Sequence, residues 1–200
     1  MLRLQAVAYT EVYRPIKADA YEYIAYAHNL KYSGVYSNKI TPDTDRLLPD
    51  ALRTPGYPLF VSLFIDKDIT WKALSSLLFA QVLLSTAVII LAYIIFSVVI
   101  GGKLALLVAS LAALSPHLIN INVYFLSETF FTFLLMMFLW ILSRLRSPPK
   151  IYLLIILGTL LAAASLTRPW IQYFILILIP LFVSWKSRLS VVIPFLAIMS

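Results

Sequence analysis

Glu128 is the ionisable residue whose surroundings most clearly suggest chemistry, because it is the one acid in residues 73–200 and stands in the apolar stretch FLSET at 125–129. An ionised carboxylate inside a membrane span costs about 2.5–3.5 kcal/mol and usually faces a polar cavity. We place Glu128 about one helical turn below the outer end of such a span. The simpler alternatives are an interfacial acid or a purely structural partner of Arg168.

Arg168 is the matching cation, in the short segment LTRP at 166–169 between two apolar runs. Its planar guanidinium can donate two parallel hydrogen bonds, which suits a phosphate oxyanion at the level of lipid headgroups. The alternatives are an anchor at the membrane interface or a structural partner for Glu128.

Asp19 begins a segment, DAYEYIAYAHNL at 19–30, that predicts a short amphipathic helix. Ala20, Ile24 and Ala27 share one face at helical spacing. Asp19 can serve as the N-cap, with Glu22 three residues later completing a capping box. It can also be a carboxylate at the membrane surface that deprotonates a hydroxyl. The two interpretations are compatible, because a cap position fixes a side chain well.

The segment RTPGYPLF at 53–60 is a rigid, turn-rich approach to an apolar stretch. Tyr57 can stack on a sugar ring or lie at the membrane interface, and Arg53 can assist in binding phosphate. A structural re-entry of the chain is the alternative. The sequence contains no zinc-protease, CxxC, P-loop or dinucleotide-binding motif, so it identifies no metal ligands.

These residues must be positioned by membrane helices. The chain has 200 residues, of which 62% are hydrophobic and 12% charged, and its mean hydropathy is +0.90. A soluble domain carries about 25% charged residues. The chain has no cysteine, which excludes a disulfide-stapled secreted module. The composition indicates an all-α integral membrane protein.

The net charge of +7 does not indicate nucleic-acid binding. Residues 1–72 hold nine Lys/Arg and eight Asp/Glu, whereas residues 73–200 hold seven Lys/Arg and Glu128. The cations of the second part lie in short loops and form no continuous stripe of the kind that follows a phosphate backbone. We therefore interpret them as signals of membrane orientation.

The apolar runs predict about five and a half membrane spans, because one span needs about 20 apolar residues. The runs cover 74–100, 104–119, 124–142, 151–166, 170–185 and, at the end of the chain, 189–200. We therefore divide the chain into a loop region with short amphipathic helices, 1–72, and a polytopic transmembrane helix bundle, 73–200.

Charges in the loops predict the orientation of this bundle. Successive loops lie on alternating sides of the membrane. The loops of one side carry six cations, Lys103, Arg144, Arg146, Lys150, Lys186 and Arg188, whereas the short loops of the other side carry Arg168. The positive-inside rule places the six in the cytoplasm and residues 1–72 outside a plasma (inner) membrane. The first residues, MLRLQAVAYTEVYRPIKAD at 1–19, contain no apolar run of the length that a signal peptide requires. We therefore expect a further helix upstream and a fragment of a longer protein.

Four segments, taken in order, resemble a known family. They are DAYEYIAYAHNLKYSGVYS at 19–37, RTPGYPLFVSLF at 53–64, SPHLININVYFLSETFFTFLL at 115–135 and LTRP at 166–169. Together they resemble the integral-membrane C-type glycosyltransferases, a group with protein O-mannosyltransferases, aminoarabinose transferases and lipopolysaccharide galacturonosyltransferase-like proteins. Each motif alone is common, and their order makes the resemblance specific.

The resemblance implies roles for the singled-out residues. Asp19 corresponds to the acid of the first extracytoplasmic loop, which is the catalytic base. Glu128 corresponds to an acid near the start of a later span, and Arg168 lies where lipid phosphate is held. Many members have an Asp-Glu pair where this chain has Asp19 and Ala20, which leaves open whether a divalent metal takes part.

The leading hypothesis is therefore a glycosyltransferase. It would move a hexosyl or pentosyl group, with inversion, from a polyprenyl-phosphate carrier to a lipid, glycan or protein hydroxyl on the extracytoplasmic side. The lipid-linked donor would be a co-substrate, and the participation of a divalent metal as a cofactor stays open. We expect the isolated 200-residue chain to be inactive. The rivals are a transporter or flippase for a lipid-linked anion, and an inactive membrane remnant.

Overall fold

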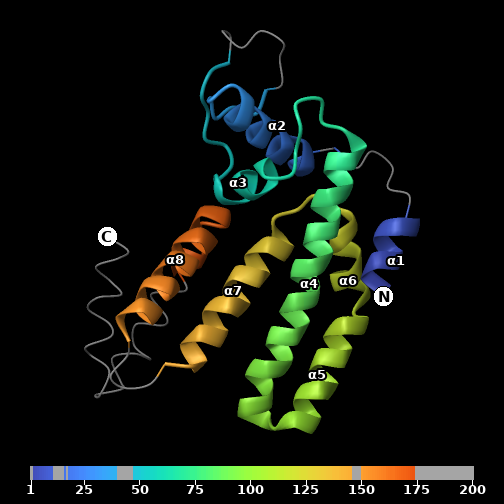
Figure 1. The fold of residues 1–200 in the computed structure, drawn as a ribbon, viewed down its shortest axis with the longest axis vertical. Helices are drawn as coiled ribbons and strands as arrows, with labels where there is room; N and C mark the ends of the chain where they lie inside the picture. Colours follow the sequence, from blue (N-terminus) through green and yellow to red (C-terminus); the bar gives the residue numbers. More distant parts are fainter. Residues whose placement is uncertain (1, 11–15, 17, 40–46, 146–149, 174–200) are drawn as a thin grey trace.

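The computed structural model describes residues 2–10, 16, 18–39, 47–145 and 150–173. These residues form helices and no strands. Figure 1 shows four helices, α4, α5, α7 and α8, running roughly along the long axis, with α2 and α3 lying at one end of them. We call residues 18–39 and 47–69, which contain α2 and α3, the cap. We call α4 to α8 the bundle.

The bounds of the helices follow the breaks expected from proline, glycine and polar residues. They are α1 Leu2–Tyr9, α2 Asp19–Tyr32, α3 Gly56–Ser62, α4 Trp71–Ile100, α5 Gly102–Leu114, α6 Pro116–Asn120, the short 3-10 helix η2 Ile121–Val123, α7 Glu128–Ser143 and α8 Ile151–Thr167.

Helix α4 begins at a well-formed cap and ends at a glycine. The Thr70 hydroxyl accepts a hydrogen bond from the Ala73 amide at 3.3 Å, and Asp66 in turn accepts from the Thr70 amide at 2.8 Å. At the other end Gly101 has φ +82°, a conformation that favours glycine, and it turns the chain into α5. Among the described helices, α4 is the one that is long and apolar enough to cross a membrane alone.

The predicted span 104–119 is two helices rather than one. The chain breaks at Ser115, and Pro116 begins α6 at a position where its missing N–H is not needed. Helices α5 and α6 with η2 are bent by 53° at this break. As one broken unit they also have the length and composition of a membrane span.

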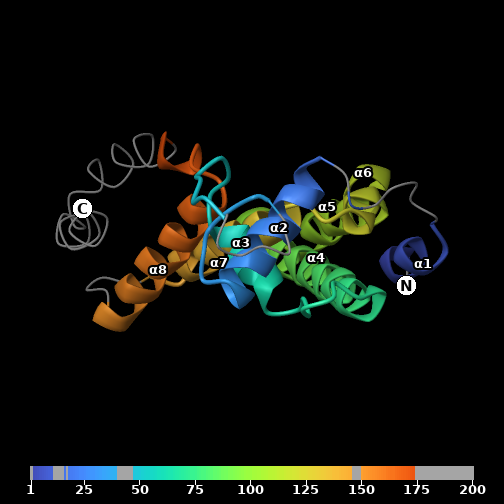
Figure 2. The same cartoon turned by 90° about the horizontal axis from the view of Figure 1, so that it is seen from above.

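Helices α7 and α8 pack against each other through aliphatic and aromatic side chains. The buried members of this core are Phe131, Leu134, Phe138, Ile141, Leu145, Leu154, Leu157, Leu161, Ala164 and Ile171. Both helices are apolar but have fewer than 18 residues, so they do not by themselves meet the length for a membrane span. Seen from above, α8 lies to one side of α7 and α4, beneath the edge of the cap (Figure 2).

The cap is joined to the bundle by a second core, and it confirms the predicted amphipathic helix. Ala20, Ile24 and Ala27 are buried on one face of α2. They pack with α3, with the first two turns of α4 and with the segment before α7, through Tyr23, Tyr57, Val61, Ile65, Leu74, Leu77 and Phe125. The apolar stripe thus holds α2 flat against the rest of the molecule.

The predicted N-cap role of Asp19 is wrong. Ala18 occupies the N-cap position, no side chain caps the helix there, and Asp19 is the first helical residue. Ala18 has φ +52°, a conformation that costs a residue with a Cβ about 1–3 kcal/mol. The Asp19 side chain is bonded to an arginine instead. The competing ion pair therefore decides where the carboxylate lies.

The third predicted span also begins later than expected. The sequence predicts 124–142, whereas α7 begins at Glu128, and Tyr124 is extended. Glu128 is thus the first residue of a helix rather than one turn inside a span. A carboxylate is favoured there, because the unpaired N–H groups of the first turn give that end a partial positive charge. The predicted run 170–185 is described only as far as residue 173, and the predicted run 189–200 lies outside the described residues.

Helix α1 is fixed to the bundle by a buried cation. Arg3 donates from Nε to the Ser85 hydroxyl at 2.8 Å, and from its two terminal nitrogens to the carbonyls of Ala113 at 3.0 Å and Ala112 at 3.2 Å. Those carbonyls belong to the last turn of α5, whose own partners are missing. Arg3 therefore closes the end of α5 at the point where the chain bends.

Candidate active site

Arg53 lies between two carboxylates of α2. Its Nη2 is 2.5 Å from Oδ1 of Asp19 and its Nε is 2.5 Å from Oε2 of Glu22. Because Asp19 and Glu22 are three residues apart on a helix, they lie on the same face, where a single guanidinium can reach both. The sequence suggested that Arg53 assists with phosphate, and the structure pairs it with the predicted base.

The environment of Arg53 favours the protonated, positively charged form of its guanidinium. The hydrogen bond to Glu22 raises the pKa of the guanidinium, burial opposes this, and the charges of Asp19 and Glu22 raise it again. The Asp19 side chain is 50% exposed, whereas that of Glu22 is 24% exposed. Asp19 is therefore the carboxylate that an incoming molecule meets first.

Glu128 and Arg168 form a second ion pair on the bundle. Nη2 of Arg168 is 2.5 Å from Oε1 of Glu128, and its Nε donates to the Ser127 hydroxyl at 3.3 Å. Their side chains are 37% and 28% exposed. The sequence left this pairing open as a structural possibility, and the contact is present. It leaves the guanidinium partly exposed.

The ends of two helices position this second pair. Glu128 is the first residue of α7, and Arg168 follows the last residue of α8 with an extended backbone. The two helices pack side by side, so the start of α7 lies beside the end of α8 (Figure 1). Both side chains therefore project at the end of the bundle that carries the cap.

Tyr23 and Ser127 join the two ion pairs. The Tyr23 and Ser127 hydroxyls are 3.4 Å apart, although the residues are 104 positions apart in the sequence. The guanidinium of Arg53 lies 5.6 Å from the centre of the Tyr23 ring. Ser127 is 1% exposed and also contacts Arg168. Contacts thus run without a gap from Asp19 on the cap to Glu128 on the bundle.

A close backbone contact sets the distance between cap and bundle beside these residues. A Cβ on Gly56 would lie 2.6 Å from the backbone nitrogen of Thr167. Next to it, the Thr54 hydroxyl donates to the Thr167 carbonyl at 3.0 Å. The segment between Arg53 and Tyr57 is therefore held directly on the residue that precedes Arg168.

Tyr57 is fully buried beneath the site. Its ring meets that of Tyr23 edge-on, with centroids 4.9 Å apart, and it also lies near the rings of Phe60 and Phe130. Burial raises the pKa of its phenol well above the usual range, and the nearby Tyr23 phenol and the negative charge of Glu128 add to this. The ring offers no open face to a sugar in this structure. Its hydroxyl has no hydrogen-bond partner among the described residues.

The structure thus brings together the five residues singled out from the sequence. Asp19 and Arg53 form one pair, Glu128 and Arg168 form the other, and Tyr57 lies under the junction between them. The segment containing Tyr57 is a short helix and not only a turn-rich loop, with Pro58 in its first turn, where proline is tolerated.

Three contributors were not recognised from the sequence. Glu22 was interpreted as part of a capping box, and its pairing with Arg53 depends on the path of the loop between them. Tyr23 and Ser127 are common residue types in ordinary surroundings. The one feature of the sequence that could have pointed to Tyr23 and Ser127 is their position next to a carboxylate. Ser127 directly precedes Glu128, and Tyr23 directly follows Glu22.

The charged side chains of the site form ion pairs with one another. Among the residues that the structure describes, no three His, Cys, Asp or Glu side chains gather into a group that could hold a metal ion. Asp19 and Glu22, two carboxylates on the same face of α2, both pair with Arg53 instead. What the arrangement offers is a half-exposed carboxylate and two guanidinium groups, which suits proton removal beside an anionic leaving group.

Apolar helices with three acids and two arginines gathered at one end are typical of one class of protein, membrane-associated proteins with a polar site among their helices. The family comparison is more specific. The family model described as dolichyl-phosphate-mannose-protein mannosyltransferase matches residues 53–200, and the chain belongs to that family. Membership indicates a membrane-associated glycosyltransferase and confirms the resemblance seen in the sequence.

The other comparisons add no relatives. No curated protein and no solved structure matches the chain. The family match begins at Arg53, so it includes Glu128 and Arg168 but not Asp19 or Glu22. The place of these two acids in the site therefore rests on their contacts with Arg53.

Proposed function

We propose that this protein transfers a sugar from a polyprenyl-phosphate carrier to a hydroxyl group, with Asp19 as the catalytic base. One observation carries the proposal. A half-exposed carboxylate and two arginines come together in one contact network, although Asp19, Arg53 and Arg168 are far apart in the sequence. The family name supports a mannose donor on a lipid phosphate and a protein acceptor.

In the proposed reaction the acceptor oxygen attacks the anomeric carbon of the sugar. The bond between that carbon and the phosphate oxygen breaks, and the lipid phosphate leaves with the electron pair. The proton of the acceptor hydroxyl passes to Asp19. Attack from the face opposite the phosphate inverts the configuration. A base within hydrogen-bonding reach of such a hydroxyl typically contributes about 10²–10⁴-fold to the rate.

The two arginines are proposed to stabilise the leaving phosphate. Each is already fixed by its carboxylate, so little reorganisation is needed when the negative charge develops. Glu128 holds Arg168 through Oε1, whereas its Oε2 has no hydrogen-bond partner among the described residues. We propose that this oxygen, and the buried Tyr57 hydroxyl near it, orient the acceptor or the donor sugar.

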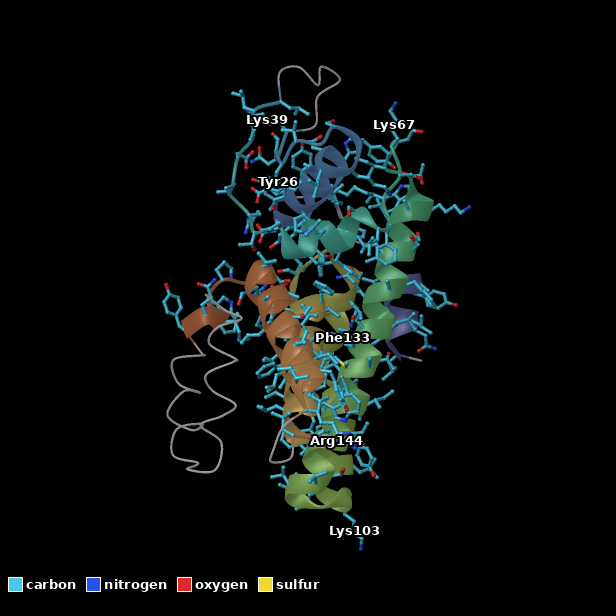
Figure 3. The ribbon with its side chains drawn as sticks, turned by 60° about the vertical axis from the view of Figure 1, so that its left-hand side comes forward. Tyr26, Lys39, Lys67, Lys103, Phe133 and Arg144 are labelled. Atoms are coloured by element: carbon cyan, nitrogen blue, oxygen red, sulfur yellow. The ribbon has the colours of Figure 1, made fainter. Side chains whose placement is uncertain are left out.

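The proposed membrane arrangement is multi-pass, with the cap on the extracytoplasmic side of a plasma (inner) membrane. Lys103 and Arg144 lie at the end of the bundle opposite Lys39, Lys67 and Tyr26 of the cap (Figure 3). The orientation rule assigns such loop cations to the cytoplasm. Trp71 is the first residue of α4 and Trp170 follows shortly after the end of α8, and they are 63% and 50% exposed, as expected of interfacial aromatics.

The test is transfer of label from a polyprenyl-phosphate mannose, radioactive in the sugar, to endogenous acceptors in membranes that contain the full-length protein. We expect Asp19→Asn to reduce the initial rate by at least about 100-fold, because an amide cannot take the proton. The matched control is Asp68→Asn, which removes the same charge from an exposed position of the cap. A rate for Asp19→Asn close to that of the unmodified protein would disprove the assignment of the base.

A further inference from the structure

Glu22 contacts Arg53 as closely as Asp19 does, yet the proposed reaction gives it no role. Both carboxylates lie 2.5 Å from the guanidinium. We propose that Glu22 is a positioning residue: it holds Arg53 by Nε and balances its charge, so that Asp19 keeps its ability to accept a proton. This inference rests on the proposed function, in which Asp19 is the base.

The balance of charge is the first argument. Two carboxylates and one guanidinium sum to one net negative charge, so Arg53 cannot neutralise both acids. With Asp19 as its single partner, Arg53 would form a neutral ion pair, and a carboxylate in such a pair holds its negative charge more strongly and accepts a proton less readily. Because Glu22 also pairs with Arg53, it offsets much of the positive charge of the guanidinium. The surroundings of Asp19 therefore keep a net negative charge.

Exposure decides which carboxylate holds the arginine and which stays available. Glu22 is 24% exposed and Asp19 50% exposed. Water screens the outer contact more than the inner one, so the inner contact with Glu22 is the stronger of the two. In agreement with this, the hydrogen bond that Arg53 donates to Glu22 is the largest influence on the pKa of Arg53. Arg53 is therefore anchored at Glu22 and directed toward Asp19.

The other charged groups nearby do not replace this anchor. On α2 the neighbouring polar group is Tyr23, whose ring lies beside Arg53 and whose hydroxyl is directed to Ser127. From α7 and α8 the charged groups are Glu128 and Arg168, which are paired with each other. Among the residues that the structure describes, Arg53 is the cation paired with both Glu22 and Asp19.

The alternative is that Glu22 merely fastens the loop before α3 to α2. The two roles differ in the pH dependence of the reaction. A fastening residue lowers the rate by the same factor at every pH, whereas a residue that balances charge also moves the acidic limb of the profile. Glu22→Gln separates them, because the amide oxygen can still accept from Nε while the negative charge is lost.

The experiment measures the initial rate of label transfer from polyprenyl-phosphate mannose against pH in membranes containing the full-length protein. For Glu22→Gln we expect the plateau to fall about three- to tenfold and the acidic limb to move about one pH unit lower. Glu22→Ala should lose more, because Arg53 is then also free to move. Asp68→Asn, which removes an equal charge from the exposed surface of the cap, should change neither quantity.

A lower plateau with an unmoved acidic limb for Glu22→Gln would overturn the inference, and so would a profile identical to that of the unmodified protein. Asp19→Asn, assayed in parallel, keeps the two proposals separate. An active Asp19→Asn variant contradicts the proposed function itself, whereas an inactive one beside an unaltered Glu22→Gln contradicts only the role of Glu22. Size-exclusion profiles in detergent check that each variant is folded, and the isosteric Glu22→Gln decides if Glu22→Ala does not accumulate.

Discussion

Gly56 at the start of α3 touches Thr167 at the end of α8 so closely that a single added methyl group has no space. A Cβ on Gly56 would lie 2.6 Å from both the backbone nitrogen and the hydroxyl of Thr167, and 2.7 Å from the carbonyl carbon of Leu166. Two of these neighbours are backbone atoms, which cannot rotate away. The cap and the bundle therefore meet through main chain at the point between Arg53 and Arg168.

Gly56→Ala is expected to push α3 away from α8 and to separate the two ion pairs. Overpacking at a tight contact costs about 1–3 kcal/mol, so thermal unfolding in detergent should shift to lower temperature and sugar transfer should fall more than tenfold. Gly102→Ala is the control, because the nearest atom to a Cβ there is the Tyr93 hydroxyl at 3.9 Å. An active, stable Gly56→Ala variant would show that this contact does not position the site.

Arg168→Lys tests whether the geometry of the guanidinium matters beyond its charge. Arg168 contacts Glu128 through Nη2 and Ser127 through Nε at the same time, and an ammonium group cannot reproduce this planar pair of contacts. We expect the rate of transfer to fall about 10²-fold with the charge retained. Arg144→Lys, at the opposite end of the bundle (Figure 3), is the control and should be neutral. Equal activity of the two variants would show that only the positive charge of Arg168, and not the geometry of its guanidinium, matters for transfer.

Tyr57→Phe is expected to have opposite effects on stability and activity. The Tyr57 hydroxyl is buried and has no hydrogen-bond partner among the described residues, so its removal should leave the unfolding temperature unchanged or raise it. If the hydroxyl is kept to contact substrate, as we propose, transfer should fall several-fold with a higher KM for the lipid donor. Unaltered kinetics would remove Tyr57 from the list of binding residues and leave it a packing role.

The hydrogen bonds of Asp66 lead us to expect that the folded protein loses stability in acid. The hydroxyl and the amide of Thr70 donate to its carboxylate and lower its pKa from the ordinary 3.8. A carboxylate whose pKa is lower in the folded state stabilises the fold above its unfolded pKa, and this contribution disappears as pH falls through the folded value. The measurement is the unfolding temperature of the unmodified protein and of Asp66→Asn from about pH 6 to about pH 2. Their difference should vanish at the acidic end, and a constant difference would contradict the prediction.

The sequence could predict several of the helices and could single out five residues of the candidate site because both depend on local patterns. Ala20, Ile24 and Ala27 have helical spacing, and all three are buried on a face of α2 that packs in the core with α3 and α4. Glu128 and Arg168 stood out because charges are rare in apolar runs, and they form the ion pair that the sequence left open.

The partners of Asp19 could not be predicted in the same way. Its place at the start of a helix favoured a capping role, but the ion pair with Arg53 determines where its carboxylate lies. That pair requires residue 53 to return to the first turn of α2, from which it is more than 30 positions away in the sequence. Long-range contacts of this kind, like that of Tyr23 with Ser127, follow from tertiary packing and leave no period in the sequence.

The contact between Tyr23 and Ser127 spans 104 positions of the chain, and the one between Thr54 and Thr167 spans 113. During synthesis the chain emerges in order, so α2 and α3 are made long before the start of α7 and the end of α8. The acids of the cap are therefore present in an unfinished protein while the later helices are still being made. A ribosome that stalls before Arg168 leaves a nascent chain in which the ion pair of Glu128 with Arg168 cannot form, so the proposed site stays incomplete until α8 is finished.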